Sequence, residues 1–233
     1  MATLALLLRP SPRLPRPPQP RTFLSHLIPP SSAAPLQTLR ASRTLPYPSA
    51  PIYSIIADVP SYAAFLPYCT HSHITHWSAP DAHTGRRWPS IGVLTSGFGA
   101  LTESFTSRVY CVPGRVVESV AGDTQTALSR DAIRHHLEGE GGHVDKEGSR
   151  GLLTHLRNTW TVEELGQRRT RIELALEFRF SSPMYAALSA GVAPKVADAM
   201  VKAFEERVGR LLSEDPRMVD ARLEQLDGSR MRR

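Results

Sequence analysis

Two segments in which apolar and polar residues alternate strictly restrict this chain to a fold built on an antiparallel sheet. The inner face of Thr170–Phe180 would carry Ile172, Leu174, Leu176, Phe178 and Phe180. The same face of Leu152–Val162 would carry Thr154, Leu156, Asn158, Trp160 and Val162. Because successive side chains of a strand point to opposite faces, each strand would have one mainly apolar and one solvated face, which is typical of antiparallel sheets. Residues 91–98, 103–111 and 116–120 are further predicted strands.

An amphipathic helix is predicted after the last of these strands. From Pro183 onward an apolar residue recurs every fourth position, at Met184, Leu188, Val192, Val196, Met200, Phe204, Val208 and Leu212. Gly191 and Pro194 predict a kink or a break near the start of this helix. Two short helices, separated at Pro60, are predicted in residues 51–66. The pattern as a whole favours an α+β fold.

The N-terminal segment differs in composition from the rest of the 233 residues. It contains six of the 28 basic residues, namely Arg9, Arg13, Arg16, Arg21, Arg40 and Arg43, and no acidic residue precedes Asp58. An acid-free segment that contains arginine and serine is typical of an organelle transit peptide. The remainder holds 22 basic and 22 acidic residues, so the net charge of +6 does not indicate a nucleic-acid-binding surface on the folded domain.

These observations divide the chain into three parts. Residues 1–43 are predicted to be a disordered mitochondrial transit peptide, cleaved near Ala41 in the sequence LRAS, and a disordered basic arm is the alternative. Residues 44–214 are predicted to form one domain, in which the glycine-rich and charged residues 122–150 are a flexible insertion. Residues 215–233 are predicted to be a charged tail.

No group of residues has the spacing of a catalytic or metal-binding motif. His71 and His73 would share one face of a strand and His76 would lie on the other, so polar residues of an exposed strand are favoured over a zinc site. Glu103 has the parity of the apolar residue Phe105, but it would be a lone acid at a strand end. We therefore predict no catalytic residue and no metal site.

The apolar face of the predicted sheet leaves two possibilities open. The C-terminal helix could pack directly on this face and form a dense core. Sheet and helix could instead enclose a cavity for an apolar ligand. Periodicity does not decide between a core and a cavity.

Four segments occur in order along the chain: IIADVPSYAAFLPYCTHSHI, GFGALTESFTSRV, NTWTV and LALEFRFSSPMYAALSAGV. Taken together, they resemble the mitochondrial coenzyme Q-binding protein family, which belongs to the START-like, polyketide cyclase-type superfamily. The resemblance extends from about Arg43 to Leu212.

The resemblance implies a helix-grip (START-like) fold. In that fold an antiparallel sheet wraps around the long C-terminal helix, and two short helices follow a first strand, here expected at Arg43–Tyr47. It also implies that ubiquinone (coenzyme Q) is bound as a ligand in an apolar cavity, with no other cofactor. The candidate ligand-binding residues are Phe65, Leu66, Trp160, Phe178, Phe180, Val196 and Met200. The corner formed by Phe65, Leu66, Pro67 and Tyr68 would close one end of the cavity, and Leu66, Pro67 and Tyr68 would contact the membrane.

The function implied by this resemblance is not enzymatic. The protein would be a carrier or chaperone for ubiquinone that supports coenzyme Q biosynthesis and respiratory electron transport. It would be peripheral to the matrix side of the inner mitochondrial membrane, with the membrane surface and coenzyme Q biosynthesis or respiratory complexes as partners, and with no nucleic-acid partner. A cyclase or aromatase-type enzyme is one alternative, and it would need an acid/base pair near Glu103. A ribosome-interacting module is the other, and it would need a basic patch on the folded domain.

Replacing Arg9, Arg13, Arg16 and Arg21 with glutamate should leave the protein in the cytosol, because transit peptides depend on a basic, acid-free composition. Replacing the same four residues with lysine keeps the charge and serves as the control. Cell fractionation measures the outcome, and an unchanged mitochondrial fraction of the glutamate variant would show that this segment is not a transit peptide.

Overall fold

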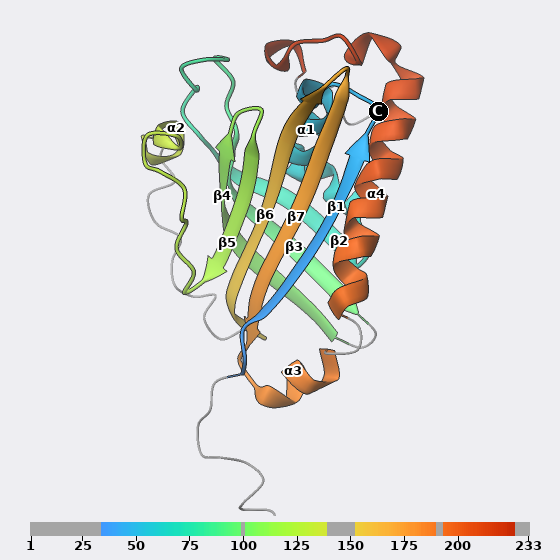
Figure 1. Ribbon diagram of the computed structural model, residues 1–233. Coiled ribbons are helices and arrows are strands. Elements are labelled where there is room, and N and C mark those ends of the chain that lie inside the picture. Colours follow the sequence, from blue (N-terminus) through green and yellow to red (C-terminus); the bar gives the residue numbers. More distant parts are fainter. Residues whose placement is uncertain (1–33, 99–100, 139–151, 190–192, 227–233) are drawn as a thin grey trace, which may run out of the picture. The chain divides into compact units, whose positions relative to one another are not determined.

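The alternating segments form one antiparallel sheet in the computed structural model (Figure 1). The structure describes residues 34–98, 101–138, 152–189 and 193–226. Within these residues the sheet has seven strands in the order β1-β7-β6-β5-β4-β3-β2, so that β2 to β7 form a meander and β1 pairs with the last strand. The strands are β1 (Gln37–Leu45), β2 (Cys69–Trp77), β3 (Pro89–Phe98), β4 (Leu101–Val112), β5 (Val116–Gly122), β6 (Leu153–Gly166) and β7 (Arg169–Phe180).

The helices lie at the connections and along one side of the sheet. They are α1 (Ser49–Ala57), the 3-10 helix η2 (Val59–Ala64), α2 (Arg134–Leu137), α3 (Pro183–Ser189) and α4 (Ala193–Glu214), followed by two 3-10 turns, Pro216–Met218 and Leu223–Gln225. Figure 1 shows α4 running beside β1 over most of the length of the strand. The two short helices, the separate α3 and α4 helices and the antiparallel sheet confirm the predicted helix-grip α+β fold.

The core forms where α4 meets the sheet. Phe204 of α4 packs against Trp160 of β6, with 4.4 Å between the ring centroids, and against Tyr62 of η2 at 5.4 Å. Val208 and Leu211, one and two turns further along α4, are also buried. Because these residues recur at helical spacing, one stripe of α4 contributes to the core while the opposite stripe stays in water.

The first strand begins earlier than the sequence predicted. β1 starts at Gln37, and it pairs with β7 through the whole of Gln37–Leu45, for example at Leu39 and Leu176. The predicted first strand at Arg43–Tyr47 and the domain boundary at residue 43 are therefore wrong. The alternation of buried and exposed residues in β1 was overlooked because the segment was classified by its basic composition. In the structure, every second residue of β1 is more buried than its neighbours. A cleavage at Ala41 would divide β1, and residues 1–33 of the predicted transit peptide lie outside the described residues.

The segment after β5 packs against the outer face of the sheet. Ile133 is 2% exposed and forms a second apolar cluster with Tyr110 of β4 and Val120 of β5. At the turn that leads into it, Gly122 has a φ of +65°, and a Cβ there would lie 2.3 Å from the carbonyl oxygen of Thr154. The prediction of a flexible insertion is therefore wrong for residues 123–138, since a few apolar residues within a polar stretch suffice to anchor it. Residues 139–150 of the predicted insertion lie outside the described residues.

His136 of α2 links this segment to the sheet. Its Nε2 accepts a hydrogen bond from the backbone N–H of Cys111 at 2.8 Å, so the neutral ring carries its proton on Nδ1, which lies 2.7 Å from Ser90 Oγ. Burial, together with the neighbouring His135, lowers the pKa of His136 from 6.5 to about 3, and the bond to Cys111 offsets only part of this. The imidazole is therefore built into the fold as a neutral group.

The depressed pKa of His136 predicts a loss of stability in mild acid. Between about pH 6.5 and pH 3 the unfolded chain binds a proton at this position and the folded chain does not, so protonation favours unfolding. At pH 5 the free energy of unfolding should be about 2 kcal/mol lower than at pH 7.5 on account of this group. The variant His136→Gln keeps a neutral acceptor and should lose this part of the pH dependence in urea unfolding. The exposed His76→Gln is the control, and an equal decrease in all three proteins would contradict the assignment.

Candidate ligand-binding cavity

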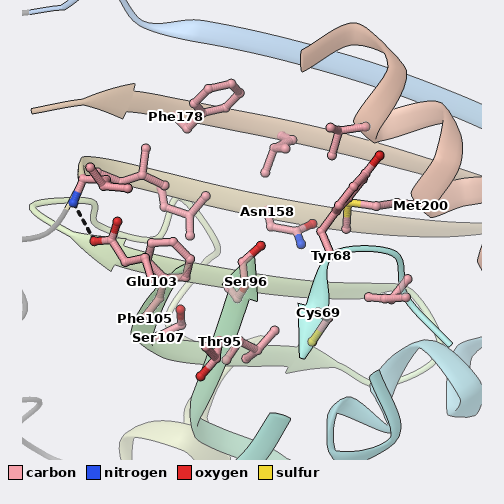
Figure 2. A pocket seen from close by; sticks show the side chains of 18 of the residues that line it. Tyr68, Cys69, Thr95, Ser96, Glu103, Phe105, Ser107, Asn158, Phe178 and Met200 are labelled. Carbon is pink, nitrogen blue, oxygen red and sulfur yellow. Dashed lines mark hydrogen bonds between the residues drawn. The ribbon is translucent and has the colours of Figure 1, made fainter. Parts of the chain in front are cut away.

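The inner face of the sheet and α4 do not pack together along their whole length. Between them lies a cavity of about 560 Å³, within the usual range for small-molecule sites. Its wall is mainly apolar, and the larger contributors are Leu94, Phe105, Leu156, Leu176, Phe178, Phe180, Val196 and Met200. Figure 2 shows Phe178 and Met200 on one side of this space and Phe105 on the other. The alternative of a dense core throughout is therefore wrong at this end of the domain.

The strand register gives the cavity a closed end and an outer end. Beyond the closed end, Trp160 of β6 is 1% exposed and packs against Phe204 of α4, and neither residue lines the cavity. From Trp160 toward the start of β6, the next inward-facing residues are Asn158 and Leu156. Leu153 follows, and it pairs with Phe180 of β7. The same order holds on α4, where Phe204, Met200 and Val196 follow at one-turn intervals. The outer end of the cavity is thus the end at which β6 begins and β7 finishes.

Five of the seven candidate ligand-binding residues line the cavity, namely Leu66, Phe178, Phe180, Val196 and Met200. Phe65 and Trp160 do not line it, and their selection is corrected here. Trp160 faces inward as predicted, but Phe204 covers it. Phe65 is half-buried against Phe204, at 4.9 Å between ring centroids, with the Arg207 guanidinium over its ring. Alternation indicated which face these aromatic residues occupy, but not which of them the helix covers.

The predicted membrane-contact corner divides into a buried and an exposed part. Leu66 is 7% exposed and belongs to the main apolar core as well as to the cavity wall, so its selection as a membrane contact is wrong. Pro67 is half-buried and Tyr68 is 40% exposed. Tyr68 has a φ of 65°, and its carbonyl oxygen accepts a hydrogen bond from the N–H of Gly97 at 2.8 Å. This turn buries one residue of the corner and leaves the last one in contact with solvent.

Several residues that line the cavity were not among the predicted ligand-binding residues. Leu39 and Leu94 have the inward parity of their strands and could have been selected on that signal. Leu152 and Leu153 both line the cavity although they are consecutive, since the register of β6 shifts between Leu153 and His155. A bulge of this kind interrupts the period of two, so periodicity contains no signal for it.

The polar residues of the wall are Tyr68, Cys69, Thr95, Ser96, Glu103, Ser107, Ser119, Asn158 and Tyr185. Asn158, Ser107 and Ser119 lie toward the closed end, and Glu103 lies toward the outer end. Glu103 Oε1 accepts a hydrogen bond from the backbone N–H of Leu152 at 2.5 Å, and burial raises the pKa of this carboxyl group while that bond offsets part of the change. The sequence placed Asn158 and Glu103 on the inner face but assigned neither a role.

The described residues contain no group of three or more His, Cys, Asp or Glu side chains that could hold a metal ion. The rings of His71 and His73 lie 5.1 Å apart on the exposed edge strand β2. In the same part of the chain, no helix combines the length and the apolarity that a membrane span requires.

The family model for "Polyketide cyclase / dehydrase and lipid transport" matches residues 45–205. The mitochondrial coenzyme Q-binding protein coq10 of Schizosaccharomyces pombe is 32% identical over 172 residues, which cover 74% of this chain and 87% of that protein. The ribosome association toxin RatA of Pseudomonas aeruginosa is 27% identical over 173 residues, covering 74% and 96%. Among solved structures, the Zhui aromatase/cyclase from Streptomyces has a TM-score of 0.54 at 16% identity, over 76% of this chain and 96% of that one. A START superfamily protein from Mycobacterium smegmatis has a TM-score of 0.52 at the same identity, over 75% and 98%.

Opposite outcomes are expected for aspartate at a buried and at an exposed position of the corner. Leu66→Asp buries an unpaired carboxylate and should lower the free energy of unfolding by about 3 kcal/mol or more. Tyr68→Asp, at an exposed position whose positive φ aspartate tolerates, should change it by about 1 kcal/mol or less. Urea unfolding measures both values, and a Leu66→Asp variant as stable as Tyr68→Asp would contradict the burial of Leu66.

Proposed function

This chain belongs to the polyketide cyclase/dehydrase and lipid transport family, and on that basis we propose that it binds coenzyme Q (ubiquinone) in the cavity between the sheet and α4. The observation that carries the proposal is the apolar cavity, in a chain whose similar proteins include mitochondrial coenzyme Q-binding proteins. The protein acts as a carrier or chaperone that holds this lipid out of the bilayer and supports coenzyme Q biosynthesis and respiratory electron transport.

The wall of the cavity suits a prenyl lipid. Each CH₂ group of a tail that leaves water for an apolar wall contributes about 0.8 kcal/mol. The leucines and phenylalanines of β3, β4, β6 and β7 supply such a wall, and Met200 supplies a flexible side chain that adapts to the ligand.

The same wall offers little for acid/base chemistry. Among its described residues Glu103 is the only carboxyl group and none is His, Lys or Arg, so the other titratable side chains are Tyr68, Cys69 and Tyr185. Glu103 accepts a hydrogen bond from a backbone N–H and the Cys69 thiol donates one to a backbone carbonyl oxygen, so these two groups are not hydrogen-bonded to each other. A cyclase or aromatase would need a second titratable group within reach of the proton that it transfers. This composition supports binding over catalysis.

The outer end of the cavity is where the lipid enters. Met184 of α3, which directly follows β7, is 60% exposed, and Tyr68 of the corner that lines the cavity is 40% exposed. With Pro67, these residues contact the matrix side of the inner mitochondrial membrane. A lipid that moves from the bilayer into the cavity at this point stays away from water throughout, which is the condition for rapid exchange of an insoluble ligand.

Val196→Trp tests whether the ligand lies in this cavity. Val196 is half-buried in the wall, so an indole there fills space that the tail would occupy. Displacing one five-carbon isoprene unit should cost on the order of 3 kcal/mol, more than a hundredfold in affinity. We would measure the co-purified coenzyme Q by lipid extraction and mass spectrometry, together with the melting temperature.

The matched control is Lys195→Trp, at an exposed position on the same helix. The Val196 variant should stay folded and lose its coenzyme Q, while the Lys195 variant keeps it. A folded Val196→Trp protein with wild-type amounts of coenzyme Q would contradict the location, and a wild-type protein without coenzyme Q that sediments with ribosomes would favour the function that the RatA name describes.

A further inference from the structure

Two buried polar atoms near the closed end of the cavity have no hydrogen-bond partner in the described part of the chain. They are Oδ1 of Asn158 and Nε1 of Trp160. Both residues lie on the inner face of β6, two positions apart. A buried polar group without a partner costs stability, and native proteins contain few of them. Phe204 covers Trp160, but Asn158 lines the cavity, so its unpaired Oδ1 indicates a place where a ligand supplies the missing partner.

Two hydroxyl side chains accompany Asn158 in the wall of the cavity. Asn158 pairs with Ser119 of β5, and Ser107 of β4 also lines the wall nearby. Figure 2 shows the Asn158 amide extending from β6 into the cavity, with both its oxygen and its nitrogen turned away from the strand. Like the serine hydroxyl groups beside it, the Asn158 amide both donates and accepts, and it carries no charge that a ligand would have to neutralise.

The wall is different between Asn158 and the outer end. There the cavity is lined mainly by apolar side chains, including Leu156, Phe178, Phe105 and Leu94. Further out, Ser96 pairs with Glu103, whose Oε1 accepts the N–H of Leu152 and whose Oε2 has no hydrogen-bond partner among the described residues. The apolar stretch between the two ends fits the tail of a lipid, and at the closed end the head of the lipid meets a neutral amide, whereas at the outer end it would meet the carboxyl group of Glu103.

The geometry points to Asn158 as the anchor of the ligand's ring, with the ligand bound head first and its tail directed to the outer end. This inference rests on the proposed function and adds the orientation of the ligand and the residue that recognises it. A quinone carbonyl oxygen accepts a hydrogen bond from the Nδ2–H of Asn158. A quinol hydroxyl group donates one to Oδ1. One amide therefore recognises the oxidised and the reduced ring, so the site binds both forms with similar affinity.

The test compares Asn158→Leu with the wild type on two ligands. Leucine is close to asparagine in size, but it removes both hydrogen-bonding functions. The first ligand is a short-chain ubiquinone, and the second is a prenyl hydrocarbon with the same tail and no ring. Lipid extraction and mass spectrometry of the protein after gel filtration measure the binding of each. Affinity for the ubiquinone should fall about tenfold or more, and affinity for the hydrocarbon should stay the same.

Stability provides a second readout. If Asn158 serves the ligand, its replacement removes an unsatisfied buried group, so the ligand-free variant should melt at the same temperature as the wild type or higher. An asparagine that served the fold would give a lower melting temperature. Thr161→Leu, at an exposed position on the same strand, controls for the effect of a new leucine on β6 and should change neither affinity.

The outcomes separate this inference from the proposed function. A wild-type protein that binds neither ubiquinone nor the hydrocarbon contradicts the proposed function and this inference with it. A wild-type protein that binds ubiquinone, with an Asn158→Leu variant that binds it equally well, contradicts the inference alone. A ring-selective loss in Glu103→Gln, with none in Asn158→Leu, would reverse the orientation.

Discussion

The packing of Phe204 on Trp160 is the contact on which the rest of the structure depends. Phe204 comes from the middle of α4 and Trp160 from the inner face of β6, and Tyr62 and Phe65 meet the same phenylalanine edge to face. On one side of this contact α4 packs closely through Val208 and Leu211. On the other side the aromatic rings hold the helix away from the sheet, and the cavity occupies the space that remains. One helix with a uniform apolar stripe thus forms a core at one end and the wall of a binding site at the other.

A cavity of this kind has an energetic cost that a ligand offsets. Empty apolar space in a protein lowers stability, because the atoms around it lack packing partners. Any molecule that fills the cavity in the folded state and does not bind the unfolded chain stabilises the protein by mass action. The domain tolerates the cost because the aromatic contacts around Phe204, the buried helix α1 and the seven paired strands do not depend on the ligand.

A structural feature could be predicted from the sequence when its apolar residues repeat at a regular interval. The inward faces of β6 and β7 and the apolar stripe of α4 repeat regularly, and these gave the fold class. Features that depend on a single contact between distant segments gave no such signal. Trp160 and Leu156 have the same parity, yet Phe204 covers one and leaves the other in the cavity wall. Ile133 is one apolar residue in a polar stretch, and only the folded sheet presents the Tyr110 surface that it covers.

A polar network on the outer face of the sheet maintains the order of the side chains inside. Glu118 of β5 is 3% exposed and accepts hydrogen bonds from Thr126 and Thr159, while Arg157 of β6 pairs with Glu177 of β7 at 3.0 Å. Glu118 lies opposite Thr159 and Arg157 lies opposite Glu177, so the network fixes the register of three strands at one level. Asn158 occupies the same level on the inner face. Because a slip of one residue would turn every side chain of a strand to the other face, these outer contacts keep the Asn158 amide in the cavity and Arg157 out of it.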